Sequence, residues 1–312
     1  MAKSNKPMSQ KEVEKSQMDL NKLIASQKFE SIEDLQNFLN QNVLGKTIEE
    51  TKSKFSHQQT NKDRAIDLIY EAHDAPSKNK AMDLIKKALI LDPNCVEANT
   101  FLGELEPTPQ KAIAYFQKAL DQAKLDIGDK NFQQLKGNFW LAHETRPYMK
   151  AKERLADCFL AMEDYDSGCN IYLEMLELNP DDNQGVRYRL APILVWRNRY
   201  DDYQKLYKQF NDDGEAGWNY TYAIYLFKKE GKTSKNAEKA LIEALDLNPH
   251  LLVFLSGSKK IPKQLPPYIQ PGSESEALHA LNMTMMLWAD EDVLGWVMNI
   301  FVKESERRNP KS

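Results

Sequence analysis

The segment AMDLIKKALILDP, residues 81–93, has two close parallels, GCNIYLEMLELNP at 168–180 and NAEKALIEALDLNP at 236–249. Each contains a small residue, a large apolar residue four positions later, Ala or Met three positions after that, and Pro five positions further on. The members are Ala81, Ile85, Ala88 and Pro93; Gly168, Tyr172, Met175 and Pro180; and Ala237, Leu241, Ala244 and Pro249. Steps of four and three keep the first three members on one helix face. Because proline cannot continue a helical hydrogen-bond ladder, the pattern predicts three amphipathic helices that stop at proline.

This pattern resembles the second helix of the tetratricopeptide repeat, a pair of antiparallel helices that recurs about every 34 residues. A fourth copy at Ala112, Phe116 and Ala119 lacks only the proline. The positions where the family usually has Leu-Gly in the first helix are Leu68-Ile69, Leu102-Gly103, Leu155-Ala156 and Leu190-Ala191. The resemblance implies an all-α fold, a right-handed superhelix (solenoid) of about five degenerate hairpins with a C-terminal capping helix pair.

The repeats divide the chain into five parts. We expect a polar, partly flexible N-terminal helical arm over 1–60, with helices near 9–27 and 31–41. Repeats 1 and 2 follow over 61–125, an insert over 126–146, and repeats 3 to 5 over 147–249. In the fifth repeat, the side chains predicted to face inward are Tyr220, Ala223, Ile224 and Phe227.

Residues 250–312 form the last part, a proline-rich crossing followed by two helices. The prolines at 262, 266, 267 and 271 predict an extended path, because the residue before a proline is biased away from helical conformation. The helices are expected at about 273–288 and 291–306, and their apolar residues include Trp288 and Trp296. Such a pair would cover the last apolar face of a helical array.

Composition limits the class of protein. Lys and Arg number 42 and Asp and Glu 46, a net charge of −4, which gives no cationic field for non-specific nucleic-acid binding. The sequence contains no run of about 18 apolar residues, so we expect no membrane span. Three cysteines suit a reducing compartment better than a disulfide framework. These features favour a cytoplasmic protein, and an effector exported by a specialised secretion system would share them.

Several strings add a narrower resemblance. They are DLIYEAHDA (67–75), DPNCVEA (92–98), GNFWLAHETRPYMKAKERLA (137–156), LNPDDNQGVRYRL (178–190), LNPHLLVFL (247–255) and LPPYIQPGSESEA (265–277). Together they look like a family of largely uncharacterised bacterial tetratricopeptide proteins, distantly similar to the suppression-of-tumorigenicity proteins. The resemblance implies the same helical array and brings no established activity. Where that family often has Arg, this chain has Lys150, which keeps the charge without the bidentate geometry.

Lys150 and Arg154 lie four positions apart on the first helix of repeat 3, where the repeat places side chains in its concave groove. The pair resembles half of the carboxylate clamp with which some tetratricopeptide domains hold a peptide C-terminus. Ile66, Tyr70 and Phe101 occupy the positions where the clamp has Lys and Asn. We therefore expect a weaker groove for an anion or an acidic peptide rather than a full clamp.

The same counting assigns aromatic and basic residues of repeats 4 and 5 to the groove, a composition typical of binding hot spots. They are Tyr188, Arg189, Trp196, Trp218, Tyr222, Tyr225, Lys228 and Lys229. The alternative for each aromatic residue is that it packs between helices.

A competing hypothesis uses the insert and nearby polar residues as an enzyme or small-ligand site. Its candidates are His143, Glu144, Arg146 and Arg187. The structural interpretation takes Thr145 as a helix N-cap with Pro147 in the first turn. It takes NPDDNQG (179–185) as a helix stop, cap and turn rather than a calcium loop. Cys158 and Cys169 are expected as buried thiols.

The leading hypothesis is a non-catalytic scaffold that binds a peptide or partner protein, with no catalytic residues, cofactor or metal. The second is the enzyme or ligand-binding protein described above. The third is a self-association module that forms homo-oligomers through the C-terminal helices carrying Trp288 and Trp296. No nucleic-acid or membrane partner is expected.

Overall fold

A computed structural model describes residues 29–46 and 60–308, together with positions 13, 16, 17, 19, 20, 23, 24, 27 and 50. The regular elements in this part of the chain are all α- or 3₁₀-helices, which confirms the all-α prediction. The chain divides into two compact units, Met1–Cys158 and Phe159–Ser312. Most of the helix predicted near 9–27 falls outside the described residues. The second predicted arm helix is α2 (Ile32–Asn42), and the Ser31 hydroxyl accepts a hydrogen bond from the Asp34 amide at 3.1 Å.

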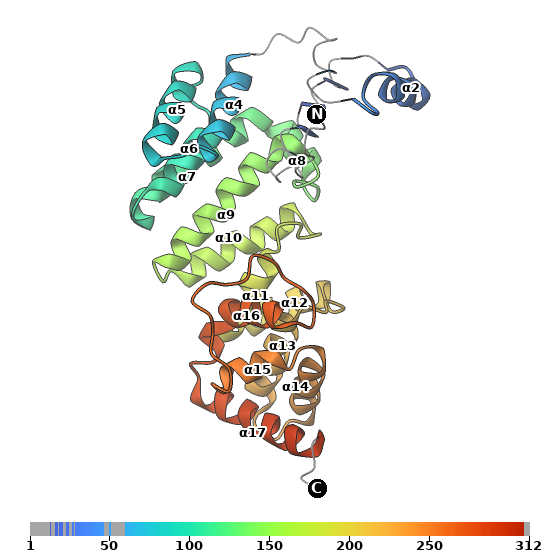
Figure 1. The fold of residues 1–312 in the computed structure, drawn as a ribbon, viewed down its shortest axis with the longest axis vertical. Helices are drawn as coiled ribbons and strands as arrows, with labels where there is room; N and C mark the ends of the chain where they lie inside the picture. The colour runs from blue at the N-terminus through green and yellow to red at the C-terminus, as the bar shows by residue number, and fades with distance from the viewer. Residues whose placement is uncertain are drawn as a thin grey trace, which may run out of the picture. The chain divides into compact units, whose positions relative to one another are not determined.

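From Asn61 onward, the first unit consists of helices joined by turns and short loops (Figure 1). They are α4 (Asn61–His73), α5 (Lys78–Leu91), α6 (Val96–Leu105), α7 (Pro109–Ile127), α8 (Asp129–Leu135), η1 (His143–Thr145) and α9 (Arg146–Ala161), whose last turn crosses the unit boundary. Helix α4 packs on α5, α6 packs on α7, and α4 also contacts α6. The expected insert therefore contains a short helix and a 3₁₀ turn.

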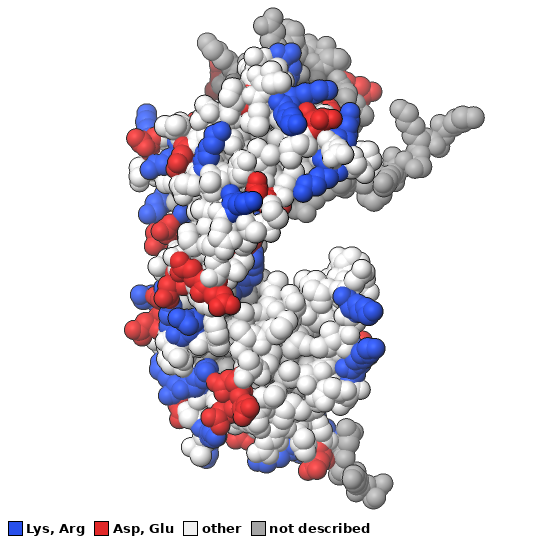
Figure 2. Space-filling model, turned by 90° about the vertical axis from the view of Figure 1, so that its left-hand side faces the viewer, with Lys and Arg blue, Asp and Glu red and all other residues white. Residues whose placement is uncertain are grey.

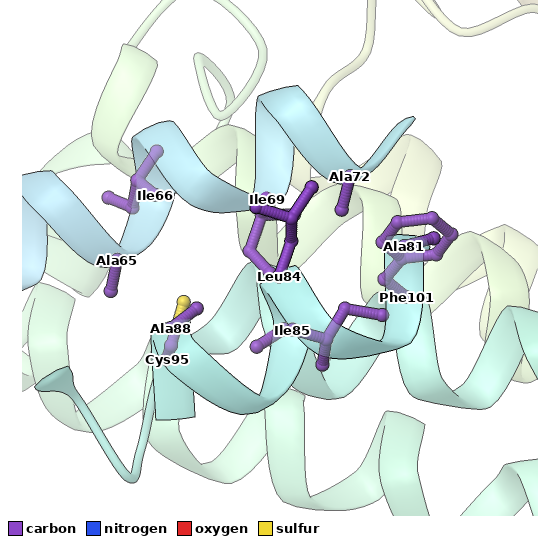
Figure 3. Close-up of a cluster of buried hydrophobic side chains, with 11 residues drawn as sticks. Ala65, Ile66, Ile69, Ala72, Ala81, Leu84, Ile85, Ala88, Cys95 and Phe101 are labelled. Carbon is purple, nitrogen blue, oxygen red and sulfur yellow. The ribbon is translucent and has the colours of Figure 1, made fainter. Parts of the chain in front are cut away.

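The core of the first helix pair forms along the face predicted from the sequence. Ala81, Ile85 and Ala88 of α5 are all buried, and they meet Ile66 and Ile69 of α4 (Figure 3). Cys95 and Phe101 join the same cluster from the next pair. The small residues leave room for the neighbouring backbone, so large side chains of one helix pack beside small ones of the other.

The three helices that precede a proline end as predicted. Asp92, Asn179 and Asn248 each come directly before the proline, and their φ angles are −139°, −142° and −152°. These extended conformations avoid the clash between the proline ring and the preceding residue. Each of the three amides still donates to the last turn of its helix, to Ala88, Met175 and Ala244 respectively. The helix is thus terminated by backbone sterics and closed by one final hydrogen bond.

Gly103 of α6 packs directly against the Phe116 ring of α7. A Cβ atom at this position would lie 2.5–2.9 Å from three ring carbons of Phe116, which is itself buried. Leu102-Gly103 is the pair expected at the Leu-Gly positions in the first helix of repeat 2. Only glycine lets the aromatic ring rest directly on the α6 backbone.

The second unit contains α10 (Tyr165–Leu178), α11 (Val186–Trp196), α12 (Tyr200–Gln209), α13 (Ala216–Glu230), α14 (Lys235–Leu247), α15 (His250–Leu255), α16 (Glu274–Thr284), η2 (Met285–Leu287) and α17 (Glu291–Arg308). Helix α13 packs on α14, α11 and α16, and α17 covers α13 and α14 (Figure 1). The four residues predicted to face inward on α13 are buried. The crossing is non-helical over 256–273, as expected, whereas the short helix α15 was not predicted.

Buried carboxylates fix the start of α13. Glu276 of α16 is buried and accepts hydrogen bonds from the Ala216 amide (3.3 Å), the Asn248 side chain (2.8 Å) and the Gly272 amide (2.7 Å). Glu215 is the N-cap of α13 and accepts from the Trp218 amide at 2.7 Å. Since a buried carboxylate is stable only when hydrogen-bonded, these contacts tie the crossing and α16 to α13.

We expect Gly103→Ala to lower the free energy of unfolding by about 1–3 kcal/mol, because the new methyl group must displace the Phe116 ring in a packed core. Urea unfolding followed by far-UV circular dichroism measures the change. The matched control is Gly295→Ala in α17, where a Cβ meets nothing within 4 Å. This control should gain up to about 1 kcal/mol from helix propensity.

The steric cause of the Gly103→Ala effect has its own test. Phe116→Leu costs stability by itself, yet it makes room for the methyl group, so the double variant should be more stable than the sum of the two single effects predicts. Additive effects of the two substitutions would show that the ring does not limit the approach of α6 to α7.

Burial raises the pKa of Glu215 to about 7, and the nearby carboxylates of Glu276 and Asp213 act in the same direction. Between about pH 4.5 and pH 7 the Glu215 carboxyl is therefore protonated in the folded protein and ionised in the unfolded protein. The free energy of unfolding consequently falls as the pH rises through this range. Wild type should lose unfolding free energy between pH 5 and pH 8, and we expect this loss to be about 2 kcal/mol smaller in Glu215→Gln, which has no carboxyl group to titrate. Denaturant unfolding at both pH values measures it, and parallel pH profiles for the two proteins would contradict it.

Candidate functional site

A pocket of about 590 Å³ lies among the first helices of the N-terminal unit. Helix α4 contributes Ile66, Ile69, Tyr70 and His73, with Asp74 at its end. Helix α6 contributes Glu97, Thr100, Phe101 and Glu104. Helix α9 contributes Pro147, Lys150, Glu153 and Arg154, and Trp140 comes from the turn before η1. Spacings of three, four and seven residues put each set on one side of its helix, so three helices present one stripe each to the same space.

The floor of the pocket is the outer surface of the core. Ile66, Ile69 and Phe101 are buried in the cluster shown in Figure 3 and also line the pocket. The His73 ring stacks on the Phe101 ring, with 4.1 Å between centroids and 10° between planes. An apolar floor held by tertiary packing keeps its shape before any ligand arrives, which lowers the cost of binding.

Trp140 is positioned by the segment that the sequence analysis treated as an insert. The Arg146 side chain donates from Nε to the Trp140 carbonyl at 2.8 Å, and its guanidinium lies 5.4 Å from the indole centroid. Phe139, next to it, is fully buried and meets the rings of Phe132 and Tyr148 edge to face. The packing of Phe139 fixes the backbone before Trp140, and Arg146 holds the Trp140 carbonyl and lies beside its indole.

The prediction for Thr145 was wrong. Its hydroxyl donates to the carbonyls of Phe139 and Ala142 and does not cap α9, because a 3₁₀ turn over His143–Thr145 runs directly into Arg146. Pro147 lies in the first turn of α9, as predicted. The hydroxyl thus closes the turn that carries Trp140.

Carboxylates outnumber cations in the pocket lining. Asp74, Glu97, Glu104 and Glu153 face only Lys150 and Arg154. The Arg154 guanidinium donates to Glu104 at 2.8 Å and to Asp157 at 3.3 Å. Half-exposed ion pairs of this kind add little stability, so the Arg154–Glu104 pair chiefly sets the local charge.

Glu97 occupies the most enclosed part of this acidic set. Burial raises its pKa, and the positive charge of Lys62 offsets part of the effect. The Cys95 thiol donates to its carboxylate at 3.7 Å, while burial raises the pKa of Cys95 itself to about 12. Cys95 is consequently a packed thiol rather than a reactive one.

In the N-terminal unit, the helix face predicted for the groove is the face that lines the pocket. Lys150, Arg154, Ile66, Tyr70 and Phe101 all lie there, the last three being residues that the sequence comparison with a carboxylate clamp expected on this face. Sequence reasoning missed the carboxylates of Glu97, Glu104 and Glu153. Glu97 and Glu104 lie four residues before and three after Phe101, a spacing that could have identified them.

The aromatic residues of α13 lie in helix packing. Trp218 and Tyr225 are only 2% and 4% exposed, and the half-buried Tyr222 stacks on Tyr207 of α12 with centroids 3.9 Å apart. Tyr203 contacts both Trp218 and Tyr225 at centroid distances of 6.4 and 4.7 Å. The alternative interpretation, packing between helices, therefore describes Trp218 and Tyr225, because α13 turns this side toward α12.

The remaining groove candidates of the second unit have partners within that unit. The Arg189 guanidinium lies 5.4 Å from the Tyr172 centroid, and Trp196 meets Tyr165 edge to face at 4.8 Å. Lys228 pairs with Asp290 at 2.8 Å, and Lys229 donates to the Tyr225 hydroxyl at 2.8 Å.

Arg187 and Tyr188 belong to an ion-pair network that holds two turns together. The N-cap residue of α11 is Gly185, and the Asp182 carboxylate accepts from the first two amides of the helix, Val186 (2.8 Å) and Arg187 (3.0 Å), as the cap-and-turn interpretation predicted. The Arg187 guanidinium bonds to Asp182 at 3.0 Å and to Asp213 at 2.8 Å, and the Tyr188 hydroxyl donates to Asp213 at 2.8 Å. Arg187 and Tyr188 therefore stabilise the packing of these two turns.

The other residues of the enzyme hypothesis do not line the pocket. His143 and Glu144 form the 3₁₀ turn, and Arg146 orients Trp140. Within the described ranges, no three His, Cys, Asp or Glu side chains form a group able to hold a metal ion. The three cysteines are buried and unbridged.

Trp288 and Trp296, the candidates for self-association, contact other helices of their own unit. The Trp288 indole donates to Thr284 at 3.0 Å, and Trp296 stacks on Phe227 with centroids 4.5 Å apart. In the described part of the chain, no helix is both long enough and apolar enough to cross a membrane. No protein-family model and no curated protein matches the chain.

We expect Asp182→Ala to lower the free energy of unfolding by about 3 kcal/mol, because α11 loses its cap and Arg187 loses a buried counter-ion. The free energy of unfolding of Asp182→Asn should lie between those of wild type and Asp182→Ala, since an amide oxygen still accepts one backbone hydrogen bond. The control is Asp181→Ala, an exposed neighbour for which a change within about 0.5 kcal/mol is expected. Equal denaturant midpoints for Asp181→Ala and Asp182→Ala would refute the assignment.

Proposed function

We propose that this protein is a non-catalytic interaction protein, a solenoid of tetratricopeptide-like hairpins that binds a peptide segment of a partner protein. The binding site is the pocket among α4, α6 and α9. The observation that carries the proposal is the lining, since the first helix of three successive predicted repeats supplies one stripe of side chains each. A groove formed by first helices is what such repeats use for binding.

Three features support the hairpin assignment. The helix pairs α4–α5, α6–α7 and α13–α14 pack closely, and the small positions Ala81, Ala112 and Ala237 are all buried. The helices that precede Pro93, Pro180 and Pro249 all have their C-cap at the residue directly before the proline. A terminal helix, α17, covers the last pair, as a helical array needs.

The lining has the composition of a protein-binding surface rather than of a reaction centre. Buried Ile66, Ile69 and Phe101 form an apolar centre, while half-buried Tyr70 and Trp140 stand beside it. Charged residues such as Glu104 and Arg154 lie at greater exposure. An apolar centre with aromatic anchors and a polar rim is the usual anatomy of a binding hot spot.

Site-specific photo-crosslinking tests this proposal. A benzoylphenylalanine at position 70 faces the pocket, whereas one at position 71 lies on the exposed side of the same helix and outside the lining. We expect position 70 to form adducts with one partner segment in cells and position 71 to form none with it. Mass spectrometry of the adduct identifies the segment.

The identified segment is then synthesised and titrated against purified full-length protein. We expect Tyr70→Ala to weaken binding at least about tenfold and Glu71→Ala to leave it unchanged. Thermal unfolding of both variants shows whether each is folded. Equal crosslinking at the two positions, or equal affinity of folded Tyr70→Ala and wild type, would refute the pocket as the binding site.

A further inference from the structure

We infer that the pocket among α4, α6 and α9 takes a cationic side chain of the partner, with an arginine guanidinium preferred to a carboxylate. This inference rests on the proposed function and names the chemistry of its ligand. It replaces the acidic peptide expected from Lys150 and Arg154 alone.

The charge of the lining is the first argument. Four carboxylates, from Asp74, Glu97, Glu104 and Glu153, share the pocket with two cations. Basic and acidic side chains are interspersed over the face shown in Figure 2 rather than gathered into one field of a single sign. Because solvent screens charges beyond about 8–10 Å, the charges in the pocket itself decide which ligand it favours.

The second argument is that Arg154 is already paired with carboxylates of its own unit. Its guanidinium bonds to Glu104 at 2.8 Å and to Asp157 at 3.3 Å. A ligand carboxylate would have to displace these acceptors and would then lie near Glu153, the residue before Arg154. An incoming cation leaves the Arg154–Glu104 ion pair in place, and the lining also holds the carboxyl groups of Asp74, Glu97 and Glu153.

The aromatic residues are the third argument. Tyr70, Phe101 and Trp140 line the same space as the carboxylates. A cation over an aromatic face gains about 0.5–2 kcal/mol, and the planar guanidinium of arginine also stacks on rings. The Trp140 indole already has the Arg146 guanidinium 5.4 Å from its centroid, so it accepts this type of contact within the chain.

The test uses small probes that need no knowledge of the partner. N-acetyl-arginine amide, its neutral isostere N-acetyl-citrulline amide and N-acetyl-glutamate amide are each titrated into full-length protein with ¹⁵N-labelled tryptophan. The indole N–H signal of Trp140, assigned with Trp140→Phe, reports occupation of the pocket. We expect the arginine probe to shift this signal saturably at millimolar concentration and to bind at least about fivefold more tightly than citrulline.

Charge-neutral variants identify the carboxylates responsible. Glu153→Gln should weaken the arginine probe about threefold to tenfold, and Glu71→Gln, on the exposed side of α4, should leave it unchanged. The indole spectrum without probe verifies that each variant is folded. Equal binding of arginine and citrulline, tighter binding of glutamate, or no effect of Glu153→Gln in a folded protein would overturn the inference.

The two proposals can fail separately. If position 70 crosslinks a partner segment that has no Arg or Lys at the contact, the ligand chemistry is wrong while the binding site stands. If the arginine probe binds and position 70 crosslinks no segment, the pocket is a cation site without a role in protein binding. Both proposals are supported if the crosslinked segment contains an arginine at the contact and if replacing that arginine by citrulline abolishes the affinity of the segment for the protein.

Discussion

An amphipathic helix cannot bury its apolar stripe alone, and this constraint shapes the described helices of both units. In the first unit the stripe of α5 closes on α4, and Gly103 lets the Phe116 ring rest against the α6 backbone. In the second unit α13 is enclosed by α11, α14, α16 and α17. Small residues matter here as much as large ones, because the distance between two helices is set by the side chains at their contact.

The same constraint produces the pocket. Once α4 and α6 have closed on α5 and α7, each helix still has a stripe that no neighbour in its pair can cover. Where α9 brings a third stripe to the same space, the uncovered residues of three helices face one another. The site is thus a consequence of how the helix pairs stack, and its apolar floor is continuous with the core beneath it.

Charged groups have different roles in the two units. In the second unit Asp182, Asp213 and Arg187 are largely buried and hydrogen-bonded to one another, so they join turns and cap α11. In the first unit Arg154 and Glu104 are more exposed and line the pocket. Solvent screens the charges of the second kind of pair, so it contributes less to stability than the buried network.

The sequence by itself determined the helical class, the helix stops before Pro93, Pro180 and Pro249, and the buried faces of α5 and α13. Those features follow from local sterics and from periodicity, which adjacent residues carry. Only the tertiary structure decided that Trp218 and Tyr225 pack against α12, and that Glu97, Glu104 and Glu153 share a pocket with Lys150 and Arg154. Periodicity shows that a residue lies on a helix face directed away from the core of its own helix pair. It does not show which side chain of another helix it then meets, because that depends on how separate helices are stacked.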